Sequence, residues 1–229
     1  MLPDTRPGVA LDSDGVCGGC RNAKAKRDID WQARSKDFGA VVAHAKGRSK
    51  GWDCVIPVSG GKDSYWQVVT CLQHGLNPLC VTYVYPGQTQ LGRENLRRLI
   101  DLGVDHIEFR LNSTIERHFV LKAFRKTGIS GLVTHMAIYT FPIRLAVEHD
   151  IPLVVYGENS AFEYGSEEDG LAGAQLTRRW LERFGVTGGT TVDDWVDEKM
   201  SRKQLEPLAL PNDEVLEAKD LRVVFLGHY

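Results

Sequence analysis

Residues 59–64, with the sequence SGGKDS, have the composition of a loop that binds phosphate. They follow the apolar run 55–58 and precede a stretch whose apolar residues are spaced as on one helix face, namely Tyr65, Val68, Val69 and Leu72. Glycines let the backbone approach an anion closely, and the first N–H groups of a helix point at it. Lys62 adds a positive charge, while Asp63 could cap the helix or hold a cation such as Mg²⁺. The sequence therefore predicts a phosphate cradle; a polar Gly-Gly turn without a ligand is the alternative interpretation.

The two commonest phosphate-binding motifs are both absent at this position. The dinucleotide motif G-x-G-x-x-G does not occur here, and the Walker A motif would need glycine in place of Ile56 and serine or threonine in place of Asp63. The cradle is therefore expected to belong to another class of nucleotide-binding protein.

Short apolar runs separated by amphipathic stretches predict the elements that must position this loop. The expected strands are 53–58, 79–84, 106–111, 152–156 and 221–226. Helices are expected after the first strand, ending near Gly75, and over 91–102, ending at Gly103. This order predicts an open α/β fold, a parallel sheet with flanking helices of the Rossmann-like type. Ligands bind at the carboxyl ends of the strands in such folds, which is where SGGKDS lies.

The composition and the hydrophobic periodicity of the sequence change near residue 50. Residues 1–50 carry many charges and little apolar periodicity, so we expect a small N-terminal appendage, followed by one main domain over 51–229. Within the segment 158–211, GSEEDGLAGAQ is expected to be a loop, and LTRRWLERFG and TVDDWVDEKM are expected to be short surface helices. An insertion after a strand in such a fold could cover the site.

Composition excludes several classes of protein. The chain has 229 residues, 42% hydrophobic and 25% charged, with a formal net charge of −2, as is usual for a soluble globular protein. This charge gives no reason to expect nucleic acid or a membrane as the main partner. There is no apolar run of about 18 residues and no secretory signal, so no membrane span and a cytoplasmic location are expected. Five cysteines without an export signal favour reduced thiols.

A second polar cluster follows a β-branched strand, in the sequence YGENSAFEYG at 156–165. Its candidate binding residues are Glu158, Asn159, Glu163 and Tyr164, and a polar loop with a helix cap from Asn159 or Ser160 is the alternative. A third candidate is HMAIYTFPIR at 135–144. Here Thr140 and Arg144 could bind phosphates, and His135 could be a base or a structural histidine.

The cysteines divide into two groups. Cys17 and Cys20 have the C-x-x-C spacing of half a zinc knuckle, and a structural zinc site needs four ligands. The others lie beside valine and leucine in expected strands and helices, where ordinary buried thiols are expected: Cys54, Cys71 and Cys80.

SGGKDS after a hydrophobic strand resembles the signature of the PP-loop ATP pyrophosphatases, which are adenine nucleotide alpha hydrolase-like in fold. Four blocks within the first 165 residues together resemble a narrower group, the N-acetyl sugar amidotransferases of surface-polysaccharide and nonulosonic-acid biosynthesis. The blocks are MLPDTRPGVALDSDGVCGGCR, DCVIPVSGGKDSYWQV, GLNPLCVTY and TFPIRLAVEHDIPLVVYGENSAFEYG. The stretch from Ser166 to about Leu221 matches only loosely. The family has another C-x-x-C before PDTRPG and continues well beyond VVFLGHY, so the resemblance implies that the family's C-terminal part is absent.

The resemblance implies an activity in O-antigen, lipopolysaccharide or related glycan biosynthesis. AMP is transferred from ATP to the acetamido oxygen of a nucleotide-linked N-acetyl sugar, with release of pyrophosphate. Ammonia, supplied by a separate glutaminase, then displaces AMP to give an acetamidino sugar. The implied cofactors are ATP, Mg²⁺ and, at Cys17 and Cys20, Zn²⁺.

The resemblance also implies roles for individual residues. Catalytic roles fall to Lys62, Asp63 and Glu158. The nucleotide would be bound by Ser59, Gly60, Gly61, Lys62, Asp63, Ser64 and Thr82, with Asp63 also at the magnesium. The resemblance places Glu158, Asn159, Glu163 and Tyr164 at the sugar or the metal; the further candidates for binding the substrate, from the third motif, are His135, Thr140 and Arg144.

Other functions are compatible with the same motifs. A PP-loop tRNA thiolase or other tRNA-modifying ligase uses this ATP chemistry on a base carbonyl, but no RNA-binding domain is visible. Replacing Cys17 would abolish a thiolation but only loosen a zinc knuckle. A nucleotide-binding remnant would bind ATP without sugar-dependent release of pyrophosphate. An adenine nucleotide hydrolase is a further option, because the sheet and the cradle do not fix the reaction.

Overall fold

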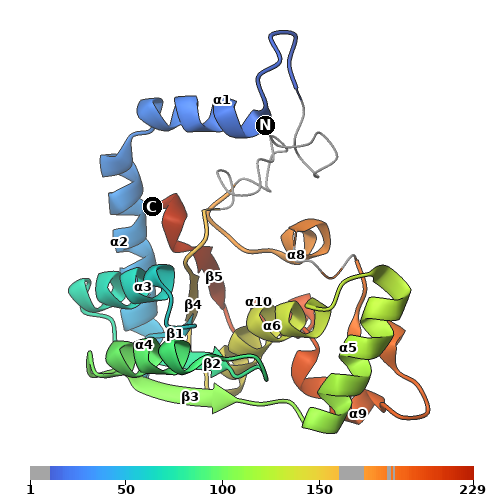
Figure 1. Ribbon diagram of the computed structural model, residues 1–229. Helices are drawn as coiled ribbons and strands as arrows, with labels where there is room; N and C mark the ends of the chain where they lie inside the picture. The colour runs from blue at the N-terminus through green and yellow to red at the C-terminus, as the bar shows by residue number, and fades with distance from the viewer. Residues whose placement is uncertain (1–10, 160–172, 185–186, 188) are drawn as a thin grey trace.

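Figure 1 shows the computed structural model, in which a five-stranded sheet carries helices on both faces. The structure describes residues 11–159, 173–184, 187 and 189–229. The strands are β1 (Cys54–Pro57), β2 (Pro78–Tyr83), β3 (Asp105–Phe109), β4 (Leu153–Tyr156) and β5 (Arg222–Phe225). Their order is β3-β2-β1-β4-β5, and every neighbouring pair is parallel. The open parallel α/β fold predicted from the sequence is confirmed.

Helices and short 3₁₀ turns connect and cover the strands. The helices are α1 (Gly18–Ala25), α2 (Trp31–Arg48), α3 (Lys62–Gln73), α4 (Gln90–Ile100), α5 (Ser113–Thr127), α6 (Leu132–Glu148), α8 (Arg178–Phe184), α9 (Arg202–Leu205) and α10 (Asp213–Ala218). The 3₁₀ turns are η1 (Lys26–Asp28), η2 (Val192–Trp195), η3 (Glu206–Leu208) and η4 (Leu226–His228). None of the described helices is long and apolar enough to cross a membrane.

The two faces of the sheet are covered by different helices because strand side chains alternate in direction. On one face, Cys54 and Ile56 of β1 pack in a cluster with residues of α2, α3 and α4. On the other face, Val55 of the same strand packs in a cluster with residues of α6 and α8. A third cluster joins α5 and α6 to the segment from η2 to η3. This two-sided burial explains why the strands read as continuous apolar runs.

Residues before position 50 take part in this packing. Helix α2 buries four residues in the same cluster as the sheet: Phe38, Val41, Val42 and Ala45. Asp30 caps the helix by accepting a hydrogen bond from the Ala33 N–H (2.9 Å). The hydrophobic core therefore continues across residue 50, although the composition of the sequence changes there.

Two expectations about helix faces are corrected by the structure. Tyr65 was expected on the apolar face of α3, but it is 44% exposed, and the buried residues of that helix are Ser64, Gln67, Val68 and Cys71. The segments expected to be surface helices instead bury their tryptophans, Trp180 in α8 and Trp195 in η2, both completely. Single sequences do not reveal which side of a short helix meets a neighbouring layer.

The order of the strands defines a switch point between β1 and β4. The chain leaves β1 through α3 toward β2, and returns through α5 and α6 to β4 on the opposite side of β1. In open α/β sheets, the crevice at the carboxyl ends of such strands is where ligands bind.

Candidate functional site

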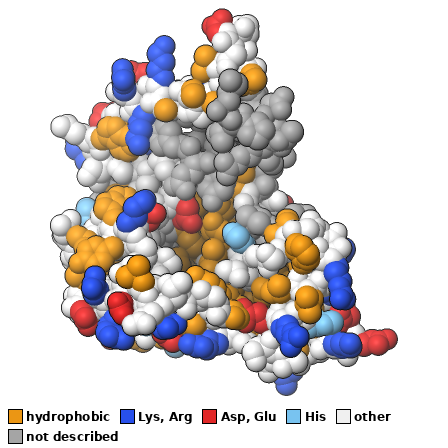
Figure 2. All heavy atoms as spheres, in the orientation of Figure 1, with side chains coloured by type: hydrophobic (Ala, Val, Ile, Leu, Met, Phe, Trp, Pro, Cys, Tyr) orange, Lys and Arg blue, Asp and Glu red, His pale blue; other side chains and the backbone are white. Residues whose placement is uncertain are grey.

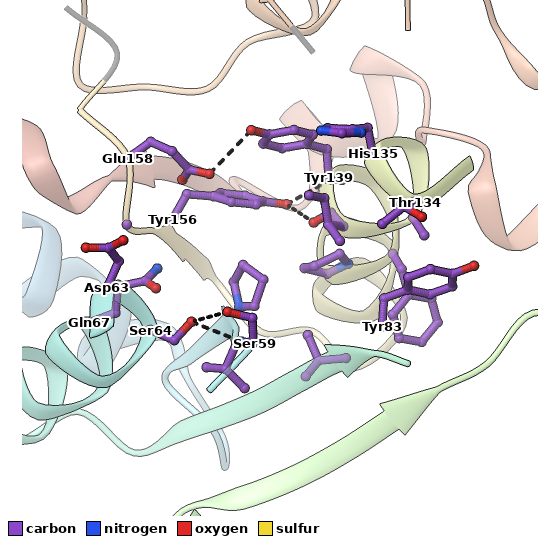
Figure 3. A pocket seen from close by; sticks show the side chains of 18 of the residues that line it. Ser59, Asp63, Ser64, Gln67, Tyr83, Thr134, His135, Tyr139, Tyr156 and Glu158 are labelled. Atoms are coloured by element: carbon purple, nitrogen blue, oxygen red, sulfur yellow. Dashed lines mark hydrogen bonds between the residues drawn. The ribbon is translucent and has the colours of Figure 1, made fainter. Parts of the chain in front are cut away.

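A cavity of about 520 Å³ opens at this switch point. Its wall is formed by the segments that follow β1, β2 and β4 and by one side of α6. Figure 2 shows the hollow with hydrophobic side chains along its inner wall, and Figure 3 shows the residues that line it. The polar side chains of the wall belong to Ser59, Asp63, Ser64, Gln67, Tyr83, Tyr85, Thr134, His135, Tyr139, Tyr156 and Glu158.

The SGGKDS loop is built as an anion cradle. Gly61 is the N-cap of α3 and no side chain caps this helix, so its first N–H groups are available to a ligand. The Ser59 N–H donates to Ser64 Oγ (2.9 Å), and the two serine hydroxyls lie 3.2 Å apart. Both serines line the cavity. This part of the loop therefore fits a phosphate group of a nucleotide.

Gly60 is required by the backbone of the loop and by its neighbour α4. Its φ angle is +80°, which L side chains rarely adopt. A Cβ atom at this position would also lie 2.7 Å from the Leu96 nitrogen and 3.1 Å from the Gly92 oxygen, both backbone atoms of α4. Gly60 therefore lets the loop turn tightly against α4.

Lys62 and Asp63 lie together at the start of α3. Lys62 Nζ is 2.5 Å from Asp63 Oδ1, and both side chains are largely exposed. Asp63 lines the cavity, whereas Lys62 does not. Because the pair is exposed, the lysine can exchange its carboxylate partner for a bound phosphate.

Thr82 holds the segment before the loop by a hydrogen bond. Its side chain is buried at the end of β2 and is not part of the cavity wall. Thr82 Oγ1 donates to the Val58 carbonyl (2.8 Å), at the residue before the loop. Since the hydroxyl has only one proton, it accepts from His106 Nε2 at 2.9 Å, which must carry a proton. Burial lowers the pKa of His106, and the charge of Glu108 opposes this. Thr82 thus positions the first residues of the cradle.

Glu158 faces the cradle from the segment after β4. Figure 3 shows its carboxylate on the same side of the cavity as that of Asp63. The Tyr139 hydroxyl of α6 donates to Glu158 Oε1 (3.3 Å). Tyr156 is fixed below them, because its hydroxyl donates to the carbonyls of Tyr139 (2.8 Å) and Ile138 (3.2 Å). Burial, and to a lesser extent the charge of Glu158, raises the pKa of Tyr156 well above its usual range, so this phenol stays neutral.

His135 lies in the cavity wall on α6, opposite the cradle. Its Nδ1 is 2.8 Å from the Gly131 carbonyl, so Nδ1 carries the proton of the neutral ring. Nε2 is then the nitrogen with a free electron pair, which is the form that a general base requires.

The other candidates from this helix do not line the cavity. Thr140 is buried, and its hydroxyl donates to the Met136 carbonyl of the preceding turn (2.7 Å). Arg144 donates to Glu206 Oε1 (2.9 Å) and to the Ala209 carbonyl (3.2 Å), and so joins α6 to the segment around η3.

The second polar cluster is only partly brought to the site. Asn159 donates from its side chain to the Gly227 carbonyl, which lies in η4 near the C-terminus. Of the candidate binding residues of this cluster, only Glu158 lines the cavity among the described residues. Glu163 and Tyr164 lie outside the described residues.

Cys17 and Cys20 lie together at the N-terminus of α1. The Cys20 N–H donates to Cys17 Sγ (3.4 Å), which lowers the pKa of the Cys17 thiol, and the thiol–thiol hydrogen bond raises that of Cys20. Among the described residues, no third histidine, cysteine or carboxylate joins them in a group that could hold a metal. The other three cysteines are buried free thiols: Cys54, Cys71 and Cys80.

Several wall residues were not predicted from the sequence, among them Gln67, Tyr83 and Tyr139. Gln67 is 3% exposed, and its Nε2 donates to the Val155 carbonyl (3.2 Å). The Tyr83 hydroxyl donates to the buried carboxylate of Glu116 (2.6 Å), and burial raises the pKa of Tyr83. Tyr139 holds Glu158. The position of Gln67 one turn after Asp63 was the only available signal, because polar residues on the inner face of a helix are uncommon unless they are used.

Comparisons with known proteins leave the family of this chain unassigned. No family model and no curated protein matches it. Among solved structures, a predicted subunit of a tRNA methyltransferase from Methanocaldococcus jannaschii has a TM-score of 0.38 and 16% sequence identity, and the match covers 76% of this chain and 66% of that chain. An NMN synthetase from Francisella tularensis has a TM-score of 0.45 and 13% identity, over 84% of this chain and 92% of that chain.

Proposed function

We propose that this protein is an ATP-dependent PP-loop enzyme that activates the amide oxygen of a nucleotide-linked N-acetyl sugar by transfer of AMP. The amide oxygen attacks the α-phosphorus, and the bond from this phosphorus to the pyrophosphate oxygen breaks. Ammonia then adds to the amide carbon and AMP leaves with the oxygen, so the products are an acetamidino sugar, AMP and pyrophosphate.

The observation that carries the ATP half of the proposal is the cradle at the switch point. Two serine hydroxyls and the start of α3, a helix without a side-chain cap, line one cavity at the carboxyl ends of β1, β2 and β4, and the Gly-Gly turn joins them without lining the cavity itself. This donor set suits the phosphates of a nucleotide. Once Lys62 leaves Asp63, its ammonium group would neutralise charge that develops on the departing pyrophosphate.

The amide half of the proposal rests on the four sequence blocks and on the character of the cavity wall. Apart from the cradle, the described wall is mostly uncharged and includes several tyrosines, which suits a neutral group better than a second polyphosphate. An amide is a poor electrophile, so a site that supplies only ammonia would not convert it; adenylation provides the leaving group that the reaction needs.

Asp63 and Glu158 are the groups that would hold Mg²⁺. They are the two carboxylates of the described cavity wall, and Mg²⁺ in nucleotide sites is bound by one or two carboxylates together with phosphate oxygens. When bound, the ion would offset negative charge on the phosphates. The roles proposed for Cys17 and Cys20 as zinc ligands, and for a separate glutaminase as the source of ammonia, are kept as part of this hypothesis.

The test is release of pyrophosphate from ATP and Mg²⁺ in the presence of ammonium, with UDP- and CMP-linked N-acetyl sugars offered one at a time. Release that requires one sugar, and that yields AMP and an amidine in equal amounts by mass spectrometry, would support the proposal. ATP binding without release under any of these conditions would favour a nucleotide-binding remnant. Release that depends on tRNA instead would favour the tRNA-modifying ligase.

A further inference from the structure

Gln67 presents the acceptor oxygen of a largely buried side chain to the cavity. The side chain is 3% exposed and lies in the cavity wall, where Figure 3 shows it between Asp63 and Ser64 on α3. Its Nε2 donates to the Val155 carbonyl of β4 (3.2 Å), which fixes Oε1 as the other end of the amide. Among the described residues, Gln67 Oε1 has no hydrogen-bond donor. This oxygen is not one of the fully buried polar atoms that lack a partner, so it is accessible from the cavity, where a ligand can donate a hydrogen bond to it.

The segment after β4 is shaped around this side chain. A Cβ atom on Gly157 would lie 2.7 Å from Gln67 Cδ and 2.9 Å from its Oε1. Gly157 does not have a positive φ angle, so the backbone conformation alone does not require glycine here. The absence of a side chain at position 157 therefore matters because it leaves room for Gln67. Helix α3 and the segment around the end of β4, which are far apart in the sequence, thus fix the position of the Gln67 amide group.

The position of Gln67 indicates which donor it would meet. It lies one helical turn after Asp63, about 5–6 Å along α3 from the residue at the cradle. The phosphoryl group to be transferred would lie near the cradle, whereas the amino group of adenine is separated from it by the ribose. The donor closest to Gln67 would then belong to the acceptor. No lysine or arginine lines the described cavity wall, so a neutral N–H group suits this position better than an anion.

We infer that Gln67 recognises the acceptor of the proposed reaction by accepting a hydrogen bond from its amide N–H. This inference rests on the proposed function. As the amide oxygen attacks phosphorus, the N–H gains positive charge, so the hydrogen bond to Gln67 Oε1 strengthens in the transition state. Gln67 makes and breaks no covalent bond, and it acts as a binding and positioning residue.

Ligand-observed NMR in the presence of Mg²⁺ and α,β-methylene-ATP tests the inference with two probes. One probe is N-acetylglucosamine, and the other is 2-O-acetylglucose, in which an ester oxygen replaces the N–H. We expect the protein to bind the amide about fivefold more tightly than the ester, the value of one neutral hydrogen bond. Gln67→Met, of similar length but without an acceptor, should abolish this preference. Gly157→Ala, which displaces Gln67 without removing it, should reduce the preference.

Gln73→Met is the matched control, because Gln73 is the exposed last residue of the same helix. It should keep the preference, and all variants should bind α,β-methylene-ATP within about twofold of the unmodified protein, since only the acceptor is affected. Equal binding of both probes, binding of neither, or a preference that survives in Gln67→Met would overturn the inference. Pyrophosphate release, measured separately with ATP, ammonium and the nucleotide-linked sugars on the same protein preparations, separates the two hypotheses: an amide preference without turnover rejects the proposed function alone.

Discussion

Lys62 Nζ lies 2.5 Å from Asp63 Oδ1, and the two side chains are 89% and 71% exposed. An ion pair this exposed is only weakly stabilising and is readily exchanged for another partner. The pair therefore keeps the lysine beside the cradle without binding it firmly, and a bound polyphosphate can take the place of the carboxylate. The Asp63 carboxylate would then be free of its lysine partner in the cavity wall, which also contains Glu158.

Lys62→Ala is expected to lower kcat/KM for ATP by about 100-fold or more, because it removes the positive charge nearest to the departing pyrophosphate. The melting temperature should change little, since the side chain is almost entirely exposed. Pyrophosphate release and thermal unfolding are measured on the same preparation. Lys203→Ala, an exposed lysine of α9, is the control and should retain full activity. Equal activity of the two variants would show that Lys62 does not act on the phosphates.

Asp63→Asn and Glu158→Gln are each expected to raise the Mg²⁺ concentration needed for half-maximal activity by about tenfold, since each removes an ionised oxygen ligand. If the two carboxylates share one ion, the double variant should raise the required Mg²⁺ concentration by less than the product of the two single increases. Titration of pyrophosphate release with Mg²⁺ measures this, and Glu214→Gln on α10 is the control. Two single variants with unchanged Mg²⁺ dependence would remove these residues from the proposed metal site.

The sequence predicted the sheet because its signal is local, and the cradle, which is also a local signal, stays a prediction. Parallel strands buried on two faces form continuous apolar runs, and the expected strands lie within two residues of β1 to β5 at each end. The cradle depends only on six adjacent residues at a strand-to-helix junction. The order of the strands and the burial of α2 required long-range packing that no local pattern encodes.

The wall of the cavity was harder to predict because its residues come from three-dimensional neighbours. Arg144 looked available for a phosphate, but its partner Glu206 is 62 residues away in the sequence. Thr82 was expected to bind the nucleotide, but its hydroxyl donates a hydrogen bond to the Val58 carbonyl on the neighbouring chain segment. Gln67 and Tyr139 read as ordinary helix residues, and only the approach of β4 and α6 brings them to the cavity.

Thr82→Val is expected to destabilise the fold by about 1–3 kcal/mol and to raise KM for ATP severalfold. The valine has the same shape, but it leaves the buried Val58 carbonyl and His106 Nε2 without the shared hydroxyl. Thr82→Ser retains the hydroxyl and should restore most of the affinity for ATP. Urea denaturation and ATP titration measure the two effects. A Thr82→Val protein with normal stability but weak ATP binding would instead indicate direct contact between Thr82 and the nucleotide.

The free energy of unfolding is expected to fall as the pH drops below about 6.5, and His106 should contribute to this decrease. Its pKa in the folded protein is lowered from 6.5, mainly by burial. Between these two pKa values the unfolded chain binds more protons, so stability is lost as the pH falls through this window and the loss becomes constant below it. The pKa of His228 is also lowered by burial, so it acts in the same direction.

His106→Gln isolates the contribution of this histidine, because glutamine has an N–H that can donate to Thr82 but does not titrate. Urea denaturation from pH 7.5 to 5 should give a shallower decrease in stability for the variant than for the unmodified protein, with the largest difference in slope just below pH 6.5. His149→Gln, at an exposed histidine after α6, is the matched control for the substitution itself. A steeper decrease in His106→Gln would mean that protonated His106 stabilises the fold, contrary to the effect of its burial.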